Sequence, residues 1–234
     1  MQTDKPIARV AVATAYDDPA VHGVDAAALN VLRNTYRLLA MTLAFSAGTA
    51  WISASLNLPH PGLLITLGGY FALLFLTSYL RNSAWGLLAV FGLTGFMGYT
   101  LGPLLAAYLS MPNGSQVVMT AMAITGAVFL GLSWYARQTN AFDMMRFDTF
   151  LFVGILTGFC LALAAYFFSM PALALAVSAL FVLLMAGLIM YQTQAIVRGG
   201  ERNYISATVT LFVAVFNLFT SLLHLLGVTG MDEA

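Results

Sequence analysis

The feature that most constrains this chain is a long hydrophobic run near its C-terminus, from Tyr204 to Leu226. About 20 residues rising 1.5 Å each are enough to cross a bilayer as a helix. Polar residues are scattered along the run: Ser206, Thr208, Thr210, Asn217, Thr220, Ser221 and His224. Lipid tails offer these groups no hydrogen bonds, whereas neighbouring helices do. The run therefore predicts the interior helix of a membrane bundle.

The composition indicates that the rest of the chain is a membrane protein as well. Of 234 residues, 61% are hydrophobic and only 8% are charged, whereas about 25% of the residues of a soluble domain are charged. The formal net charge is zero and no basic block occurs, so nucleic acid is not expected as a partner. We expect an all-α polytopic membrane protein whose surroundings are the lipid bilayer.

Hydropathy divides the chain into seven spans. They cover about residues 36–56, 62–80, 84–109, 115–136, 148–168, 172–195 and 203–227. We expect a seven-transmembrane helix bundle over residues 31–227, with the last helix central. A flexible cytoplasmic tail is expected at residues 1–30 and a short C-terminal tail at residues 228–234. Asp25 is a plausible N-cap for the first helix. Residues 1–30 lack the continuous apolar run of a cleavable signal peptide.

All basic residues fall on one side of the membrane if the chain crosses it seven times. They are Lys5, Arg9, Arg33, Arg37, Arg81, Arg137, Arg146, Arg198 and Arg202. The positive-inside rule then predicts a cytoplasmic N-terminus and a C-terminus outside. A six-crossing arrangement with a re-entrant last span stays open, because the segment after that span carries no Lys or Arg.

Small residues in the third span predict a close helix contact. Gly98 and Gly102 are separated by one turn and form a GxxxG step, which lets two helix backbones approach each other. Pro103 follows at once and has no N–H to donate, so we expect it to loosen the helix near its outer end.

Several classes of function are disfavoured by what the spans lack. No Asp, Glu, Lys or Arg lies at membrane mid-depth, which argues against a proton-driven transporter. The only lysine, Lys5, is in the tail, so no retinal Schiff base can form in the last span. One cysteine and three scattered histidines predict no metal or haem site and no cofactor. No serine stands in a Gly-x-Ser-x-Gly motif, and His224 is interpreted as a neutral residue at the outer interface, so we expect no enzyme.

Two polar groups remain as candidate sites. The segment Tyr191 to Gln194, at the cytoplasmic end of the sixth span, either lines a polar cavity or is an interfacial helix end anchored by Tyr191. Asn217 is expected to form a hydrogen bond to another helix, worth about 1 kcal/mol, or to contact a ligand. The connection over residues 137–148 alternates aromatic and charged residues and is expected to lie on the membrane surface.

Several short motifs resemble the bacterial YccA branch of the Bax inhibitor-1 family. They are Val31-Leu32-Arg33-Asn34-Thr35-Tyr36, Thr42-Leu43-Ala44-Phe45-Ser46-Ala47, Thr94-Gly95-Phe96 with Gly98-Tyr99 and Leu101-Gly102-Pro103, and Gly199-Gly200-Glu201-x-Asn203-Tyr204-Ile205-x-Ala207-Thr208-Val209, followed by Asn217 and Ser221-Leu222-Leu223. The resemblance covers about residues 31–227, and its last stretch is the most specific. It implies a seven-helix bundle with the last helix central.

The resemblance implies two activities. Some family members are pH-sensitive calcium leak channels that use two acidic residues, whose positions correspond here to Gln192 and Ala214. An amide and a methyl group cannot supply the carboxylate charge that Ca²⁺ favours, nor titrate as a coupled acidic pair. The arginine that closes the pore in those members has Arg81 as its approximate counterpart.

The second implied activity is binding and restraint of the membrane AAA protease FtsH. A polar cytoplasmic tail, here with Lys5, Arg9, Asp17 and Asp18, gives such a protease a segment to engage. The leading hypothesis is therefore a non-enzymatic modulator of FtsH in the bacterial inner membrane. The alternative is a calcium or other cation leak channel that uses Gln192, Asn217 and the hydroxyl groups of the last span.

Overall fold

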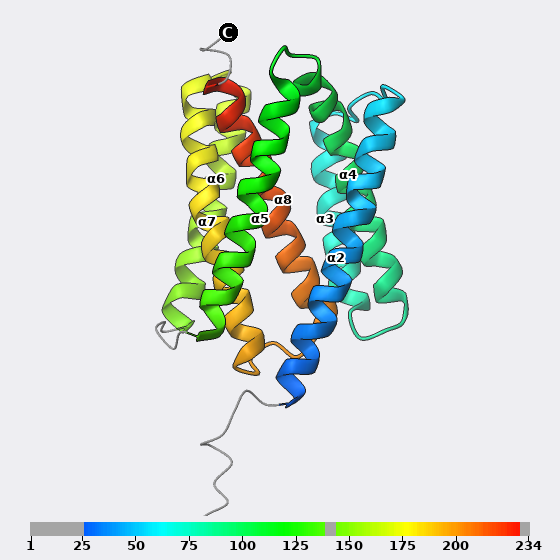
Figure 1. Cartoon of the computed structure of the whole chain (residues 1–234), viewed down its shortest axis with the longest axis vertical. Helices are drawn as coiled ribbons and strands as arrows, with labels where there is room; N and C mark the ends of the chain where they lie inside the picture. The colour runs from blue at the N-terminus through cyan, green and yellow to red at the C-terminus, as the bar shows by residue number, and fades with distance from the viewer. Residues whose placement is uncertain (1–25, 139–143, 230–234) are drawn as a thin grey trace, which may run out of the picture.

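The computed structural model describes residues 26–138 and 144–229, which form seven helices and no strand (Figure 1). The helices are α2 (Ala26–Ser55), α3 (Leu63–Leu80), α4 (Trp85–Leu109), α5 (Gly114–Gln138), α6 (Met144–Phe167), α7 (Pro171–Val197) and α8 (Tyr204–Thr229). All seven are long and apolar enough to cross a membrane. The predicted all-α fold with seven spans is confirmed.

The helix boundaries differ most from the predicted spans at the start of α2 and in the connection between α5 and α6. Helix α2 begins at Ala26, next to the predicted N-cap position, so residues 26–30 belong to the first helix although the domain boundary at residue 30 placed them in the tail. The predicted cap Asp25 lies outside the described residues. Helix α5 continues to Gln138 and α6 begins at Met144. The connection expected over residues 137–148 is therefore shorter than predicted, and its residues 139–143 are not described.

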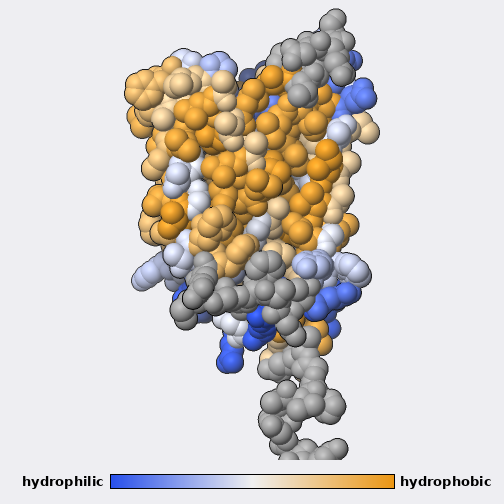
Figure 2. Space-filling view, turned by 90° about the vertical axis from the view of Figure 1, so that its left-hand side faces the viewer, coloured by the Kyte–Doolittle hydropathy of each residue, from blue (hydrophilic) through white to orange (hydrophobic). Residues whose placement is uncertain are grey.

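The outer surface of the bundle is apolar, as a lipid-facing surface must be. Leu64 is 85% exposed, Phe75 74% and Trp51 72%, exposures that would form an unfavourable apolar patch in water. Figure 2 shows hydrophobic residues across the middle of one side, with hydrophilic residues gathered mainly at its ends. Lipid tails cover such a surface, and helices leave no unpaired backbone group toward them.

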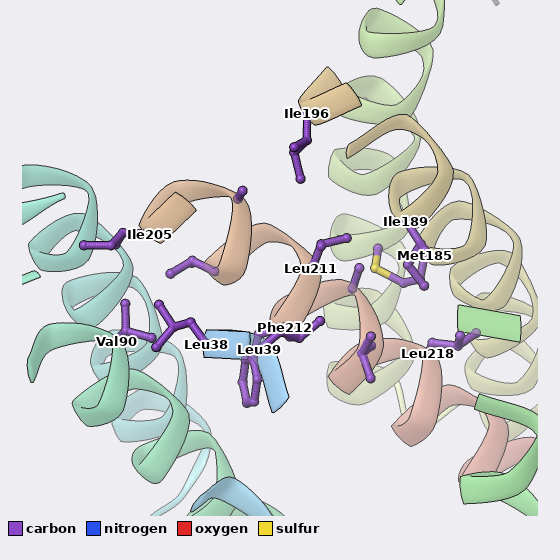
Figure 3. Close-up of a cluster of buried hydrophobic side chains, with 14 of the residues drawn as sticks. Leu38, Leu39, Val90, Met185, Ile189, Ile196, Ile205, Leu211, Phe212 and Leu218 are labelled. Carbon is purple, nitrogen blue, oxygen red and sulfur yellow. The ribbon is translucent and has the colours of Figure 1, made fainter. Parts of the chain in front are cut away.

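Helix α8 lies between two groups of helices, α2 to α4 and α5 to α7 (Figure 1). It packs against α2, α4, α5 and α7. Its residues Leu211 and Phe212 are completely buried. Figure 3 shows Phe212 beside Leu38 and Leu39 of α2, while Leu211 points toward Met185 of α7. The prediction that the last helix is central is confirmed.

Helices α2 and α4 are in close contact, and the predicted GxxxG step of α4 lies at this contact. A Cβ atom on Gly98 would collide with the backbone carbonyl oxygen of Ser46 in α2, and one on Gly102 would collide with the side chain of Ser53. Glycine is required at both positions because α2 and α4 leave no space for a methyl group. Helix α4 continues past Pro103 and ends at Leu109.

Candidate functional site

Six buried polar residues lie at one end of the bundle, where α2 and α8 begin and α5 and α7 end. They are Thr35 of α2, Ser133 of α5, Gln192, Thr193 and Gln194 of α7, and Thr208 of α8. We call this set the polar layer. None of its members is more than 6% exposed. We call this end of the bundle the arginine end, because Arg33, Arg37, Arg81, Arg137, Arg198 and Arg202 lie at it.

Three contacts of α2 hold the helices together at the level of the polar layer. The Tyr36 hydroxyl lies 3.4 Å from the Thr193 Oγ1 of α7. The Thr208 hydroxyl of α8 donates to the carbonyl oxygen of Tyr204 in its own helix at 2.7 Å and also lies 3.3 Å from the backbone oxygen of Thr35. The Arg137 guanidinium of α5 lies 5.2 Å from the centre of the Tyr36 ring, a cation–π distance. Tyr36 therefore contacts both α5 and α7.

Three atoms of the polar layer are buried without a hydrogen-bond partner in the described part of the chain. They are the hydroxyl oxygens of Thr35 and Ser133 and the Nε2 of Gln192. Leaving such a group unpaired costs about 1–3 kcal/mol. Native interiors pair nearly all buried polar groups, so exceptions are characteristic of functional or hydrated sites. The segment Tyr191 to Gln194 thus carries its amides into the bundle interior rather than onto the membrane surface.

The predicted ion-site positions are not brought into one cavity. Ala214 is completely buried in the hydrophobic core. Asn217 lines an apolar cavity of about 410 Å³ between α3, α4, α6 and α7. Arg81 lines a different cavity of about 320 Å³, beside Ser206. Neither cavity is lined by Gln192 or Ala214.

Within the described residues, Asn217 does not form the expected hydrogen bond to another helix. Its Nδ2 instead donates to the carbonyl oxygen of Val213, one turn earlier in α8, at 2.8 Å. Thr210 and Thr220 also donate to carbonyl oxygens of their own helix. Side chains of this kind can satisfy themselves on the preceding turn. The many polar groups of α8 therefore need fewer neighbours than the sequence suggested.

The turn between α7 and α8 is fixed by its two glycines. Gly199 has φ +73°, a left-handed conformation that favours glycine. Gly200 N–H donates to the carbonyl oxygen of Ala195 at 2.9 Å, and Gly199 N–H donates to that of Ile196 at 3.0 Å. This pair of bonds is the Schellman motif, which satisfies the last carbonyls of a helix.

Asn203 begins α8 and ties it to the turn between α3 and α4. Its Oδ1 accepts from the N–H of Ile205 at 3.0 Å and from that of Ser206 at 3.1 Å, which caps the helix. Its Nδ2 donates to the carbonyl oxygen of Arg81 at 3.0 Å and to the Oδ1 of Asn82 at 2.8 Å. The motif that begins at Gly199 and contains Asn203, the most specific part of the family resemblance, thus has a structural role at the arginine end.

At the opposite end of the bundle, His224 of α8 pairs with a serine that the sequence did not single out. Its Nδ1 lies 2.8 Å from the Ser178 hydroxyl of α7, and that hydroxyl also lies 3.0 Å from the carbonyl oxygen of Ala174. A hydroxyl has one proton, so the tautomer of His224 decides whether Ser178 donates to the ring or to Ala174. In either case the pair links α7 to α8.

The described residues contain no group of three or more His, Cys, Asp or Glu side chains that could hold a metal ion. The predicted tail residues Lys5, Arg9, Asp17 and Asp18 lie outside the described part of the chain. The sequence did not identify Thr35 and Ser133 as members of a polar site, because a single hydroxyl residue in an apolar span is too common to stand out.

Comparison with known proteins connects this arrangement to a family. The family described as "Inhibitor of apoptosis-promoting Bax1" matches residues 28–231. The chain is 46% identical over 202 residues to "Modulator of FtsH protease YccA" of Escherichia coli, covering 86% of this chain and 91% of that protein. It is 51% identical over 203 residues to an uncharacterized protein of Pseudomonas aeruginosa, covering 87% of this chain and 91% of that protein. The chain therefore belongs to the Bax inhibitor-1 family.

Proposed function

We propose that this protein is a non-enzymatic modulator that binds and restrains the membrane protease FtsH in the bacterial inner membrane. The observation that carries the proposal is the 46% identity to "Modulator of FtsH protease YccA", which extends over nearly all of the bundle. A second protein similar to this chain over the same length is named "Inner membrane protein YccA". The seven apolar helices agree with a partner that itself lies in the membrane.

We further propose that the arginine end faces the cytoplasm, where FtsH acts. Arginines are retained on the cytoplasmic side during insertion. The 25 residues before α2 would then extend into the cytoplasm and give the protease a polar segment to engage. A reporter enzyme active only outside the cytoplasm, fused after Ala234, is expected to be active. An inactive fusion would favour a last span that does not cross the membrane.

Binding is tested by purifying the tagged full-length protein from membranes and measuring how much FtsH comes with it. Restraint is tested by following the half-life of a membrane substrate of FtsH, which is expected to lengthen when this protein is present in excess. Deletion of residues 2–24 is expected to weaken restraint. The matched control replaces the same residues by a scrambled sequence of equal length and charge, which should keep the effect if length and polarity matter. The proposal would be refuted if no FtsH co-purified and the half-life of the substrate did not lengthen.

A cation leak through the polar layer is the second candidate function. The observation that favours it is the group of buried polar atoms without partners, including the amide of Gln192. Oxygen atoms in such a layer can contact a passing ion, but no carboxylate is present among the six residues. The expected leak is therefore weak and independent of pH between about 6 and 8, because no acid of the layer titrates there.

Calcium flux into liposomes that contain the purified protein separates the two candidates. The matched variant combines Gln192→Asp with Ala214→Asp, which restores the two acidic positions implied by the family. A silent native protein together with a leaking double variant would support the modulator. A leak in the native protein at the level of the double variant would show that the amide and hydroxyl groups carry the ion.

A further inference from the structure

A groove runs along the outside of the bundle between α2 and α5. Three cavities of about 510, 410 and 440 Å³ follow one another from the arginine end toward the opposite end. The first and second share Tyr36 and Arg137, and the second and third share Leu43 and Phe129. Helices α2 and α5 are not among the closely packed pairs of the described bundle, and α8, including Phe212, contributes to the floor of the third cavity.

The section of the groove nearest the arginine end is positively charged. Arg33 of α2 and Arg137 of α5 both line the first cavity, and both side chains are exposed. Arg33 donates a hydrogen bond to the side-chain oxygen of Asn30, and Arg137 lies over the Tyr36 ring. Neither is paired with a carboxylate within the described chain. Two guanidinium groups at one mouth attract an anion such as a phosphate.

The next section is apolar except for one hydroxyl. Leu39, Leu43 and Phe129 line it, and Trp134, which is 63% exposed, stands at its edge. Ser133 also lines it, is 3% exposed, and has a hydroxyl without a hydrogen-bond partner. A cationic mouth that leads into an apolar groove with a buried hydroxyl at the boundary matches the order of groups along a phospholipid, from phosphate to ester to acyl chain.

The two halves of the groove differ in charge. The third cavity, toward the opposite end, is lined by 18 residues, none of which is charged. The arginines therefore select for charge in only one leaflet. We propose that the groove between α2 and α5 binds an anionic phospholipid of the leaflet at the arginine end, with its phosphate between Arg33 and Arg137 and an acyl chain along Leu39, Leu43 and Phe129.

The proposal is tested with Trp134 as the reporter at the edge of the groove. The other two tryptophans are removed by Trp51→Phe and Trp85→Phe. The protein is placed in vesicles of equal parts phosphatidylglycerol and phosphatidylcholine, with brominated acyl chains, which quench tryptophan fluorescence, on one lipid or on the other. The surface charge is thus the same in both sets. The quenching is expected to show phosphatidylglycerol enriched about fivefold or more beside Trp134, the effect of one or two arginines at a membrane surface.

Three variants of this protein make the assignment specific. Arg33→Gln with Arg137→Gln is expected to bring the enrichment close to onefold. Arg33→Lys with Arg137→Lys keeps the charge and is expected to keep most of the enrichment. The control Arg202→Gln removes an exposed arginine of the turn between α7 and α8 and should change nothing.

Four results would overturn the proposal. Equal quenching by the two lipids in the parent would mean that no anionic lipid is selected. Quenching by neither would mean that protein, such as a helix of a partner, covers the groove. Enrichment that survives the double glutamine change would place the lipid elsewhere. If the double lysine variant lost the enrichment as completely as the double glutamine variant, the loss would be due to altered structure rather than to the removed charge.

Discussion

Replacing Asn203 by alanine should destabilise the protein more than any other single change in the turn between α7 and α8. The side chain makes four hydrogen bonds, two as an acceptor from the first turn of α8 and two as a donor to the turn between α3 and α4. Alanine removes both functions at once. It leaves the start of α8 uncapped and unties the helix from the neighbouring turn.

The size of the effect follows from these bonds. Loss of an asparagine cap costs about 1 kcal/mol, and each of the two exposed bonds to Arg81 and Asn82 contributes about 0.5 kcal/mol, the lower end of the usual range. Asn203→Ala should therefore lower the free energy of unfolding by about 2 kcal/mol. Asn203→Ser keeps an oxygen that caps the helix but is too short to reach the other turn, so it should cost only about 1 kcal/mol.

The assay is unfolding of the purified protein in mixed micelles with increasing SDS, followed by loss of helical circular dichroism. Arg202→Gln, next to Asn203 in the turn, serves as a control that should change the free energy by less than about 0.5 kcal/mol, as surface substitutions do. Equal losses for the serine and alanine variants would refute the capping role. A loss below about 0.5 kcal/mol for alanine would refute both roles.

Three further changes test other parts of the bundle in the same assay. Gly98→Ala should destabilise by about 1–3 kcal/mol because the new Cβ meets backbone of α2, while Gly48→Ala, whose Cβ meets nothing within 4 Å, should be neutral or slightly stabilising; equal effects would contradict the close packing. Ser178→Ala should cost about 0.6 kcal/mol, the average for a bond between membrane helices, and adding His224→Ala should cost little more; fully additive losses would show that the two side chains do not interact. Gln192→Leu, which removes a buried donor without a partner, should stabilise or leave stability unchanged; a loss above about 1 kcal/mol would show that the amide is paired.

The fold was predictable from the sequence because hydropathy, charge and small residues agree. The polar residues of the last span indicated that α8 lies inside the bundle. The GxxxG step at Gly98 and Gly102 indicated that α4 packs closely against another helix. Bond partners were less predictable. Asn217 was expected to reach another helix, but its amide returns to its own backbone, a choice that depends on a side-chain rotamer. Pattern alone cannot distinguish these two outcomes.

The candidate site was predictable along α7 and at Thr208 of the last span, but not on α2 and α5. Gln192 was found because two amides stand together at the end of the sixth span and because it aligns with an acidic position of the family, but Thr35 and Ser133 come from other helices and join the polar layer only through the fold. The separation of Arg81 and Asn217 into different cavities likewise depends on helix rotation. The charged groove between α2 and α5 needed both helices in place, since its two arginines are about a hundred residues apart.

The central position of α8 has a consequence for how the protein is made. Helices α2 to α4 leave the ribosome first and α5 to α7 follow. In the finished bundle α4 packs against α2 and α3, and α7 packs against α5 and α6. The helix that packs against both groups is the last to be synthesised. Until it enters the membrane, the two groups have a largely unfilled space between them. A chain that stops before Tyr204 should therefore insert but fail to become compact, and quality control would have its best opportunity to remove it during that interval.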